Sequence, residues 1–225
     1  RSSEFMSIRV KICGVTTHTD VEIIEAAGAD SMGVISNVSV DTPRAVTETT
    51  AKELFDAASP YLSTVLVTMP ASVESAVELG LSLQPDVVQI HTEFSGAQYR
   101  QLASAIPSAI VGVVGASSSS RAYRIASSVD GLLIDSVGGD GGGGTGETHD
   151  WSETAAIVEA ISTPVILAGG LTPENVGPAI DAVDPYGVDV ASGVETHSPN
   201  KDQDAVTKFV TNARNVSHGN TLTES

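Results

Sequence analysis

The sequence predicts an α/β protein that folds as a single closed (β/α)8 TIM barrel. Short β-branched runs recur eight times along the chain, and segments with helical spacing lie between them at a repeat of about 25 residues. A repeating strand and helix implies parallel strands joined by right-handed crossovers, and eight such units close into a barrel. The 225 residues are enough for one domain of this kind.

The predicted strands are Ile8–Ile12, Ser31–Ile35, Thr64–Thr68, Val87–Ile90, Ile110–Val114, Gly131–Ile134, Pro164–Leu167 and Val188–Ala191. The first helix is expected to be capped by Asp20 and to stop at Gly28, and another is expected to run from Val73 to near Gly80. An open doubly wound sheet is the alternative fold. No G-x-G-x-x-G pattern follows the first strand, however, and eight continuous apolar strands favour closure.

The charge balance excludes several classes of partner. Twenty-eight acidic residues face 11 basic ones, which gives a net charge of -17 that would repel a nucleic-acid backbone. The apolar runs are far shorter than the roughly 18 residues needed to span a bilayer, so no membrane partner is expected. Such an acidic surface is typical of proteins from salt-loving organisms, where counterions screen it; an ordinary acidic protein is the alternative.

Cys13 is the only cysteine, so neither an internal disulfide nor a cysteine-rich zinc site can form, and a cytoplasmic location is expected. Residues 1–5 show no pattern of their own and are interpreted as remnants of an expression vector. The barrel domain is predicted over residues 6–216, and residues 217–225 are expected to form a flexible tail.

In such a barrel the functional residues lie where the strands end. Gly169-Gly170 follow the seventh predicted strand, and Ser192-Gly193 follow the eighth. Glycines at these positions allow backbone N–H groups to approach an anion. Each glycine could serve only a tight turn, but two such sites at adjacent strand ends favour a phosphate-binding site.

Two further strand ends carry groups that can move protons. If Val10 and Ile12 face the helices, Lys11 and Cys13 face the barrel interior, where the Lys11 ammonium is expected to lower the pKa of the thiol. Asp135 follows an apolar strand, where a carboxylate needs a partner or a function. A thiolate base and a carboxylic acid on opposite sides of a sugar phosphate would form an acid/base pair. An inert cysteine and a helix-capping aspartate are the alternatives.

Loops at the same end supply candidate substrate contacts. The glycine-rich tract over residues 138–146 is interpreted as a lid, with a passive linker as the alternative. Arg44 is expected to pair with a substrate carboxylate, with an ordinary surface arginine as the alternative. His91 is expected to line the pocket, with a hydrogen-bonded core histidine as the alternative. The histidines show no metal-ligand spacing, so no metal is expected.

Several stretches of the chain resemble phosphoribosylanthranilate isomerases, over nearly the whole length from Met6 to about Val210. The stretches are Val10–Thr16, Glu25–Asp30, Val88–His91, Gly143–Gly146, His149–Trp151, Leu167–Val176 and Tyr186–Glu195. The cysteine-glycine motif of the first strand, taken together with the motif of the last strand, is highly specific for this family.

The resemblance implies a (β/α)8 barrel enzyme of tryptophan biosynthesis that converts N-(5-phosphoribosyl)anthranilate to 1-(2-carboxyphenylamino)-1-deoxyribulose 5-phosphate by an Amadori rearrangement, without a cofactor. It implies Cys13 as general base, Asp135 as general acid and Arg44 as the anthranilate carboxylate ligand. The phosphate would lie on the loops of Gly169-Gly170 and Ser192-Gly193. The substrate would also contact a set of further residues: His91, Gly144, Gly146 and Asp189.

Three positions depart from the family pattern. Glu147 stands where a lysine is usual, Thr92 replaces a glycine, and the lid carries extra glycines. A histidine-pathway isomerase would have aspartate in place of Cys13, which argues against that assignment. A catalytically silent phosphosugar-binding barrel is the alternative from another functional class, and the oligomeric state, monomer or homodimer, stays open.

Overall fold

The computed structural model of the chain describes residues 8–135 and 151–216. The expectations for residues 1–5, for the glycine-rich lid with Gly144 and Gly146, for Glu147 and for the tail from residue 217 fall outside this described part.

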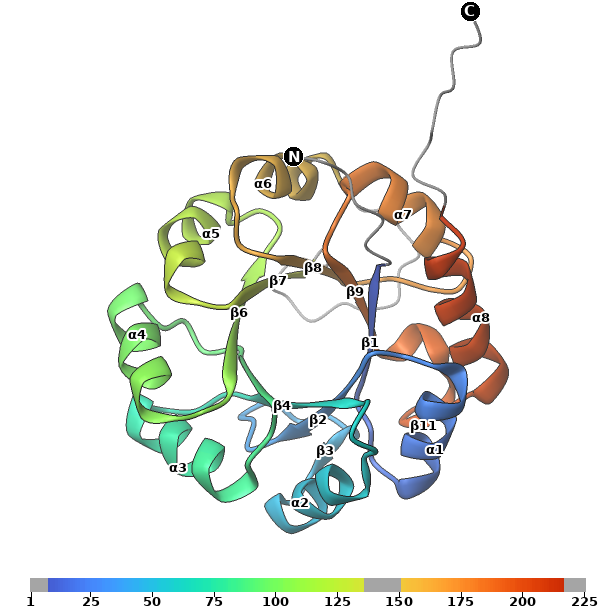
Figure 1. Cartoon of the computed structure of the whole chain (residues 1–225), viewed down its shortest axis with the longest axis horizontal. Helices are drawn as coiled ribbons and strands as arrows, with labels where there is room; N and C mark the ends of the chain where they lie inside the picture. Colours follow the sequence, from blue (N-terminus) through green and yellow to red (C-terminus); the bar gives the residue numbers. More distant parts are fainter. Residues whose placement is uncertain (1–7, 136–150, 217–225) are drawn as a thin grey trace, which may run out of the picture.

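Eight parallel strands form a closed barrel (Figure 1), as the sequence predicted. Their hydrogen-bonded order is β1-β9-β8-β7-β6-β5-β4-β2, and pairing of β1 with β2 closes the ring. A two-residue strand, β3 (Ala45–Val46), pairs with β2 beside the ring. The barrel strands are β1 (Arg9–Cys13), β2 (Ser31–Ser36), β4 (Ser63–Thr68), β5 (Val87–Ile90), β6 (Ala109–Gly115), β7 (Gly131–Asp135), β8 (Val165–Ala168) and β9 (Gly187–Val190).

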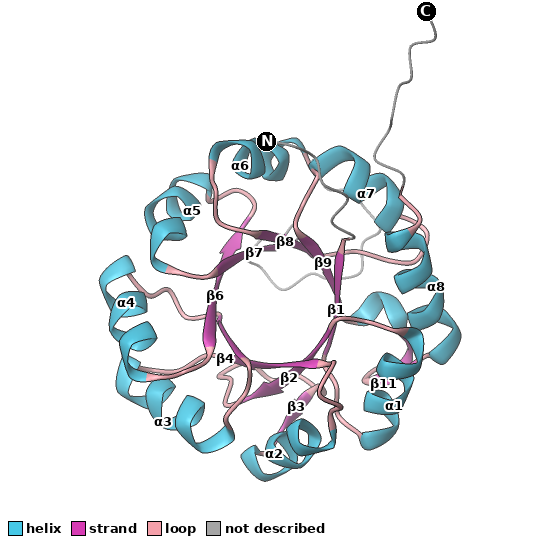
Figure 2. Ribbon diagram, in the orientation of Figure 1, coloured by secondary structure: helices cyan, strands magenta, loops and turns pink. Residues whose placement is uncertain are grey.

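A helix follows each strand of the ring and packs on its outside (Figure 2). The helices are α1 (His18–Ala27), α2 (Glu48–Ala57), α3 (Val73–Leu83), α4 (Gly96–Ala105), α5 (Ser119–Ile125), α6 (Ser152–Ala160), α7 (Val176–Val183) and α8 (Gln203–Arg214). Two 3-10 turns, η1 (Ala126–Ser128) and η2 (Ser192–Val194), and a small antiparallel hairpin of β10 (Glu195–His197) and β11 (Asn200–Lys201) complete the described elements. None of the helices in the described ranges is long and apolar enough to cross a bilayer.

Two helix ends differ from the sequence prediction. Thr17, not Asp20, is the N-cap of α1; Asp20 is the third helical residue and returns the bond to the backbone of Thr17. Gly28 does end this helix, in the left-handed conformation. Helix α3, by contrast, continues past Gly80 to Leu83. Gly80 lies inside this helix, where a Cβ would come within 3.1 Å of the Ile106 side chain, so the glycine allows close packing and does not end the helix.

The alternation along β1 divides the strand between two environments. Val10 and Ile12 are fully buried in the layer between barrel and helices. Lys11 and Cys13 point to the other face, where Cys13 packs against valines of β4. The prediction that the lysine and the cysteine share the barrel interior is therefore confirmed.

Candidate active site

The predicted functional residues that the structure describes gather at the carboxyl end of the barrel. Cys13 ends β1 and Asp135 ends β7, while Gly169 and Ser192 begin the loops after β8 and β9. Because the strands are parallel, all of these ends lie at the same mouth of the barrel. Between β1 and β7 the ring contains β9 and β8, so the two glycine loops lie between the cysteine strand and the aspartate strand.

Cys13 and Lys11 lie side by side over Gly33 of the neighbouring strand β2. A Cβ at Gly33 would lie 2.9 Å from the sulfur of Cys13 and 3.0 Å from Nζ of Lys11. Any side chain at this position of β2 would therefore displace one of the two groups. The glycine leaves the space that brings the ammonium to the thiol.

Lys11 also forms a buried ion pair with Asp189 of β9. Its Nζ donates to Oδ2 over 2.8 Å, and both side chains are over 90% buried. Burial opposes the charged form of Lys11, but attraction to Asp189 and Cys13 outweighs it and raises the pKa of the lysine. The second carboxylate oxygen, Oδ1, is buried and has no hydrogen-bond partner among the described residues.

The net pKa of the Cys13 thiol differs from the sequence expectation. Burial raises it, and this effect is larger than the lowering by Lys11 and Lys201; Asp189 adds a further increase. The Lys11 ammonium does lower the pKa of the thiol, as expected from the sequence. The expectation of a lowered pKa is nevertheless wrong, because the sum of all effects raises it. The reason is that the thiol itself is buried and that the carboxylate paired with Lys11 adds a negative charge nearby.

Asp135 occupies the last position of β7 and is partly buried. It pairs in register with Ala168, the residue that immediately precedes Gly169. Its backbone carbonyl accepts a hydrogen bond from Ala116, which anchors the end of β7 to the loop after β6. The carboxyl group is therefore carried by a firmly paired strand end, next to the first glycine loop.

The two glycine loops pack against each other. Gly169 and Gly170 have φ values of 88° and 64°, a conformation that favours glycine. Asn175 closes this loop by accepting from the Thr172 N–H and donating to the Gly170 carbonyl. A Cβ at Gly193 would collide with the Leu171 carbonyl oxygen, so only glycine permits the close approach of the second loop. The prediction that both loops lie at adjacent strand ends is confirmed.

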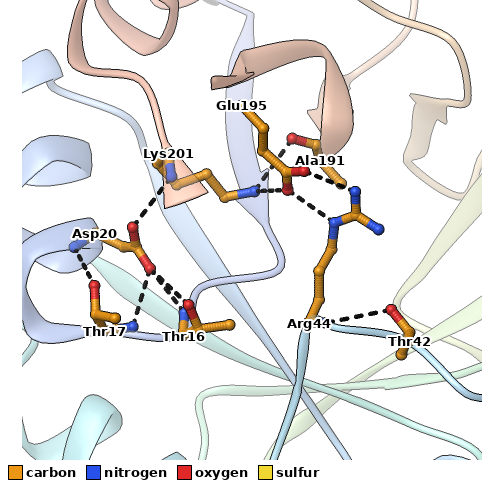
Figure 3. Close-up of polar contacts among 8 residues, drawn as sticks. All are labelled: Thr16, Thr17, Asp20, Thr42, Arg44, Ala191, Glu195 and Lys201. Atoms are coloured by element: carbon orange, nitrogen blue, oxygen red, sulfur yellow. Dashed lines mark hydrogen bonds and ion pairs between the residues drawn. The ribbon is translucent and has the colours of Figure 1, made fainter. Parts of the chain in front are cut away.

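Arg44 lies over the turn that follows Cys13. A Cβ at Gly14 would lie 2.6 Å from Cδ of Arg44, so the arginine stem crosses directly above this glycine. The guanidinium forms a two-point ion pair with Glu195, with Nε–Oε1 and Nη2–Oε2 distances of 2.8 and 2.7 Å (Figure 3). Arg44, which is predicted to bind the substrate carboxylate, thus lies beside Cys13, the predicted base. The guanidinium of Arg44 is already paired with one carboxylate, that of Glu195.

Glu195 is shared between Arg44 and Lys201. The two partners Glu195 and Lys201 face each other across the β10–β11 hairpin, and Nζ of the lysine lies 2.8 Å from Oε1. The same Nζ donates to the carbonyl of Ala191, directly before Ser192. Burial opposes ionisation of Glu195, but the hydrogen bonds from its two cationic partners outweigh it and lower its pKa.

Asp20 ties this hairpin to the loop after β1. One carboxylate oxygen accepts from the backbone N–H groups of Thr16 and Thr17, and the other accepts from the backbone N–H of Lys201 (Figure 3). The loops that follow the first and the last strand of the barrel are therefore joined by one buried carboxylate.

His91 follows β5, and its Nε2 lies 3.0 Å from the amide nitrogen of Gln89. Burial, together with the positive charge of Lys11, lowers its pKa to about 4, against a smaller opposing effect of the Asp189 carboxylate. The imidazole is therefore neutral near pH 7 and can act as a hydrogen-bonding group, but not as a cation.

The opposite mouth of the barrel contains a separate cavity of about 380 Å³. Residues at the starts of strands line it, including Arg9, Ser31, Ser63 and Gly187, together with Tyr61 and Tyr186. Lys11 and Gln89, which contact residues of the candidate active site, also line this cavity. It lies away from the strand ends that carry Cys13 and Asp135, so we do not assign it to the candidate active site.

Comparison with known proteins identifies the family. The family model of N-(5'phosphoribosyl)anthranilate (PRA) isomerase matches residues 10–212. A relative from Haloferax volcanii named N-(5'-phosphoribosyl)anthranilate isomerase is 50% identical over 206 residues, which cover 92% of this chain and 93% of the relative. The chain belongs to the PRA isomerase family. A second relative of the same name, from Haloarcula marismortui, is 48% identical over 211 residues and covers 94% and 98% of the two chains.

Solved PRA isomerases share the barrel. The enzyme from Thermotoga maritima superposes with a TM-score of 0.81 at 31% identity, and the match covers 92% of this chain and 98% of that one. Another PRA isomerase structure, a complex with reduced 1-(o-carboxyphenylamino)-1-deoxyribulose 5-phosphate, gives a TM-score of 0.77 at 30% identity, with 92% and 98% covered. The haloarchaeal relatives agree with the salt-loving source predicted from the acidic composition.

The sequence patterns of this PRA isomerase family member predict no role for Glu195 or Lys201. Glu195 is part of the quoted motif of the last strand, and Lys201 is one of only four lysines in the chain. Because lysine is scarce in this chain, its presence at position 201 is the sequence feature that could have marked Lys201 as functional. Their partnership with Arg44, however, spans 151 residues of sequence, and no local pattern reports it.

Within the described ranges, no group of three or more His, Cys, Asp or Glu side chains is arranged to hold a metal ion.

Proposed function

We propose that this PRA isomerase family member converts N-(5-phosphoribosyl)anthranilate to 1-(2-carboxyphenylamino)-1-deoxyribulose 5-phosphate with Cys13 as general base and Asp135 as general acid. The observation that carries the proposal is the order of strand ends around one mouth of the barrel. The cysteine strand and the aspartate strand flank the two strands whose loops carry the glycines of the proposed phosphate site.

The first step is opening of the ribose ring. Asp135 in its protonated form donates a proton to the ring oxygen, the bond from C1′ to that oxygen breaks, and the anthranilate nitrogen lone pair forms a protonated Schiff base at C1′. The ring oxygen leaves as a hydroxyl group, and Asp135 is left as a carboxylate.

The second step is proton removal from C2′. The Cys13 thiolate takes this proton, and the electrons of the C–H bond form the C1′–C2′ double bond while the Schiff base becomes a neutral amine. The resulting enolamine then tautomerises: C1′ gains a proton and the C2′ hydroxyl loses one, which gives the ketose. The overall reaction is an isomerisation that needs no external oxidant or reductant.

Lys11 supports the basic form of Cys13 in this scheme. Burial raises the pKa of the thiol, so the thiolate needs a counter-charge inside the barrel, and the Lys11 ammonium beside it supplies one. Asp189 keeps the lysine charged and in place, while its second carboxylate oxygen remains available to accept a hydrogen bond from the substrate.

The remaining contacts hold the two ends of the substrate. Gly169, Gly170, Ser192 and Gly193 bind the phosphate through their loops, and Arg44 binds the anthranilate carboxylate. His91, neutral near pH 7, lines the sugar-binding space. Gly144 and Gly146 are proposed substrate contacts from outside the described residues.

The wider assignments follow the same logic. The barrel domain is proposed to span residues 6–216, and the partner is a small phosphosugar. The cytoplasm is the proposed location, because the single cysteine is a buried thiol. One solved relative is named as a dimeric enzyme; light scattering on this chain will distinguish the monomer from the homodimer.

A fluorescence assay that follows loss of phosphoribosylanthranilate tests the proposal. Cys13→Ser changes one atom and is expected to fold normally but lose most turnover, because a hydroxyl is a much weaker base near neutral pH. Asp135→Asn keeps the size and removes the proton, which is expected to slow the reaction at least ~100-fold. Parental rates in either folded variant would refute the role given to that residue, and an inactive parent protein would refute the function.

A further inference from the structure

The buried carboxylate of Glu195 bonds to both Arg44 and Lys201. Its side chain is only 3% exposed, and it accepts from two nitrogens of Arg44 and from Lys201. Lys201 is fully buried as a side chain and also donates to the Ala191 carbonyl. A buried carboxylate with this many charge-assisted bonds has one defined orientation.

The contact geometry assigns the two edges of the Arg44 guanidinium to different tasks. Glu195 occupies the edge formed by Nε and Nη2. The adjacent edge, here called the outer edge, is formed by Nη1 and the second N–H of Nη2 and is not used by Glu195. The terminal nitrogen without a bond to Glu195 points away from that carboxylate (Figure 3). The outer edge is the one that a second carboxylate can approach with two parallel hydrogen bonds.

The charges of the cluster match such a second carboxylate. Among the three side chains joined by these ion pairs, Arg44 and Lys201 carry two positive charges and Glu195 carries one negative charge, so Glu195 balances only one of the two cations. The buried Asp20 carboxylate nearby accepts from the backbone N–H groups of Thr16, Thr17 and Lys201 and forms an ion pair with neither cation. Lys201 is enclosed, whereas the Arg44 side chain is 21% exposed, so the surplus positive charge of these three side chains is presented by the arginine. The arginine stem crosses Gly14, directly after the proposed base Cys13, and this places the surplus charge beside the reacting centre.

We propose that Glu195, held by Lys201, is a positioning residue that fixes the Arg44 guanidinium so that its outer edge binds the aromatic carboxylate of the substrate. This inference rests on the proposed function. The immobilised guanidinium loses little conformational freedom on binding, and a substrate lacking the carboxylate gains nothing from it. Glu195 therefore contributes to selectivity without touching the substrate.

The test compares two ligands that differ only in the carboxylate. The probes are the reduced product, 1-(2-carboxyphenylamino)-1-deoxyribulose 5-phosphate in reduced form, and its counterpart with phenyl in place of carboxyphenyl. Dissociation constants are measured by calorimetry on the whole chain. Glu195→Gln is expected to weaken binding of the carboxylated ligand about tenfold or more, which corresponds to one charge-assisted hydrogen bond. Binding of the phenyl ligand is expected to weaken less than about twofold.

Kinetics and a double-mutant cycle separate positioning from a general structural role. Glu195→Gln is expected to raise KM by the same factor, with kcat reduced less than about threefold. In an Arg44→Ala background the Glu195→Gln change is expected to have no further effect on either ligand. Glu195→Asp, which keeps the charge on a shorter stem, is expected to restore part of the affinity for the carboxylated ligand.

Asp56→Asn is the matched control, because it removes a carboxylate from an exposed ion pair of 2.7 Å with Lys52. If Glu195→Gln does not fold, the double variant Glu195→Gln with Lys201→Met removes the buried charges in balance and takes its place. A folded variant that keeps the parental preference for the carboxylated ligand overturns the inference. An inactive parent protein instead overturns the proposed function.

Discussion

Lys11 and Asp189 are paired in register on β1 and β9, and this register produces the 2.8 Å buried ion pair inside the barrel. The two residues are 178 positions apart in the sequence, and they meet because the last strand of the barrel lies next to the first. The pair places a charged lysine beside the Cys13 thiol, and the Asp189 carboxylate balances the charge of that lysine.

Asp189→Asn is expected to lower the free energy of unfolding by about 3 kcal/mol, because it leaves the Lys11 ammonium buried without a carboxylate. Chemical denaturation of the parent and the variant measures the difference. Asp56→Asn, which breaks an exposed ion pair, is expected to change stability by less than about 0.5 kcal/mol. An equal loss of unfolding free energy in the two variants would show that the buried pair contributes no more to stability than the exposed pair.

The raised pKa of Cys13 predicts an alkaline limb in the activity profile. The base acts as a thiolate, and burial moves the pKa above its ordinary value, so kcat/KM is expected to rise as the pH increases from 7 to 9. The residual rate of Cys13→Ser is expected to lack this rise. A parental profile that is flat from pH 6 upward would mean that the thiolate already predominates below neutral pH.

His91 predicts a loss of stability in acid. Its pKa in the folded protein is about 4 against an ordinary value near 6.5, so the folded state resists protonation that the unfolded chain accepts. The free energy of unfolding therefore keeps its full value above pH 6.5 and falls by up to about 3 kcal/mol as the pH decreases toward 4. Denaturation curves of the parent and His91→Gln between pH 7 and 4.5 measure it. Parallel pH dependence in the two proteins would contradict the prediction.

Gly170→Asp is expected to abolish substrate affinity while the circular dichroism spectrum remains that of an α/β barrel. The new carboxylate would lie in the loop proposed to bind the phosphate and would repel it. Gly177→Asp is the control, because a Cβ there meets nothing closer than 3.8 Å and the added charge lies on α7 and not in the loop. An unchanged KM in the first variant would place the phosphate elsewhere.

The acidic surface predicts stabilisation by salt. The chain has 28 acidic and 11 basic residues, so its surface charges repel one another. The Debye length, over which this repulsion acts, is ~30 Å at 0.01 M salt but only ~3 Å at 1 M. The melting temperature is expected to rise with potassium chloride into the molar range. Activity is expected to persist, since the contacts of Arg44 and the glycine loops are short-ranged. Melts and assays at 0.1 and 2 M check both, and a protein most stable and most active at 0.1 M would refute salt adaptation.

The sequence by itself determined the barrel and the strand ends that matter. Eight apolar runs with helical segments between them imply parallel strands, because helical crossovers join parallel neighbours and cover strands that are buried on both faces. Strand polarity then places Cys13, Asp135 and the glycine pairs at one mouth, and alternation places Lys11 beside Cys13. These are local or periodic features that do not depend on which distant residues meet.

Only the tertiary structure decided how the charges inside that mouth are balanced. The partners of Lys11 and Arg44 lie 178 and 151 residues away, and they are found only when the barrel closes. The direction of the Cys13 pKa depends on burial weighed against three surrounding charges, which no sequence pattern contains. Electrostatic energies depend on distance and on exclusion of water, and both quantities exist only in the folded chain.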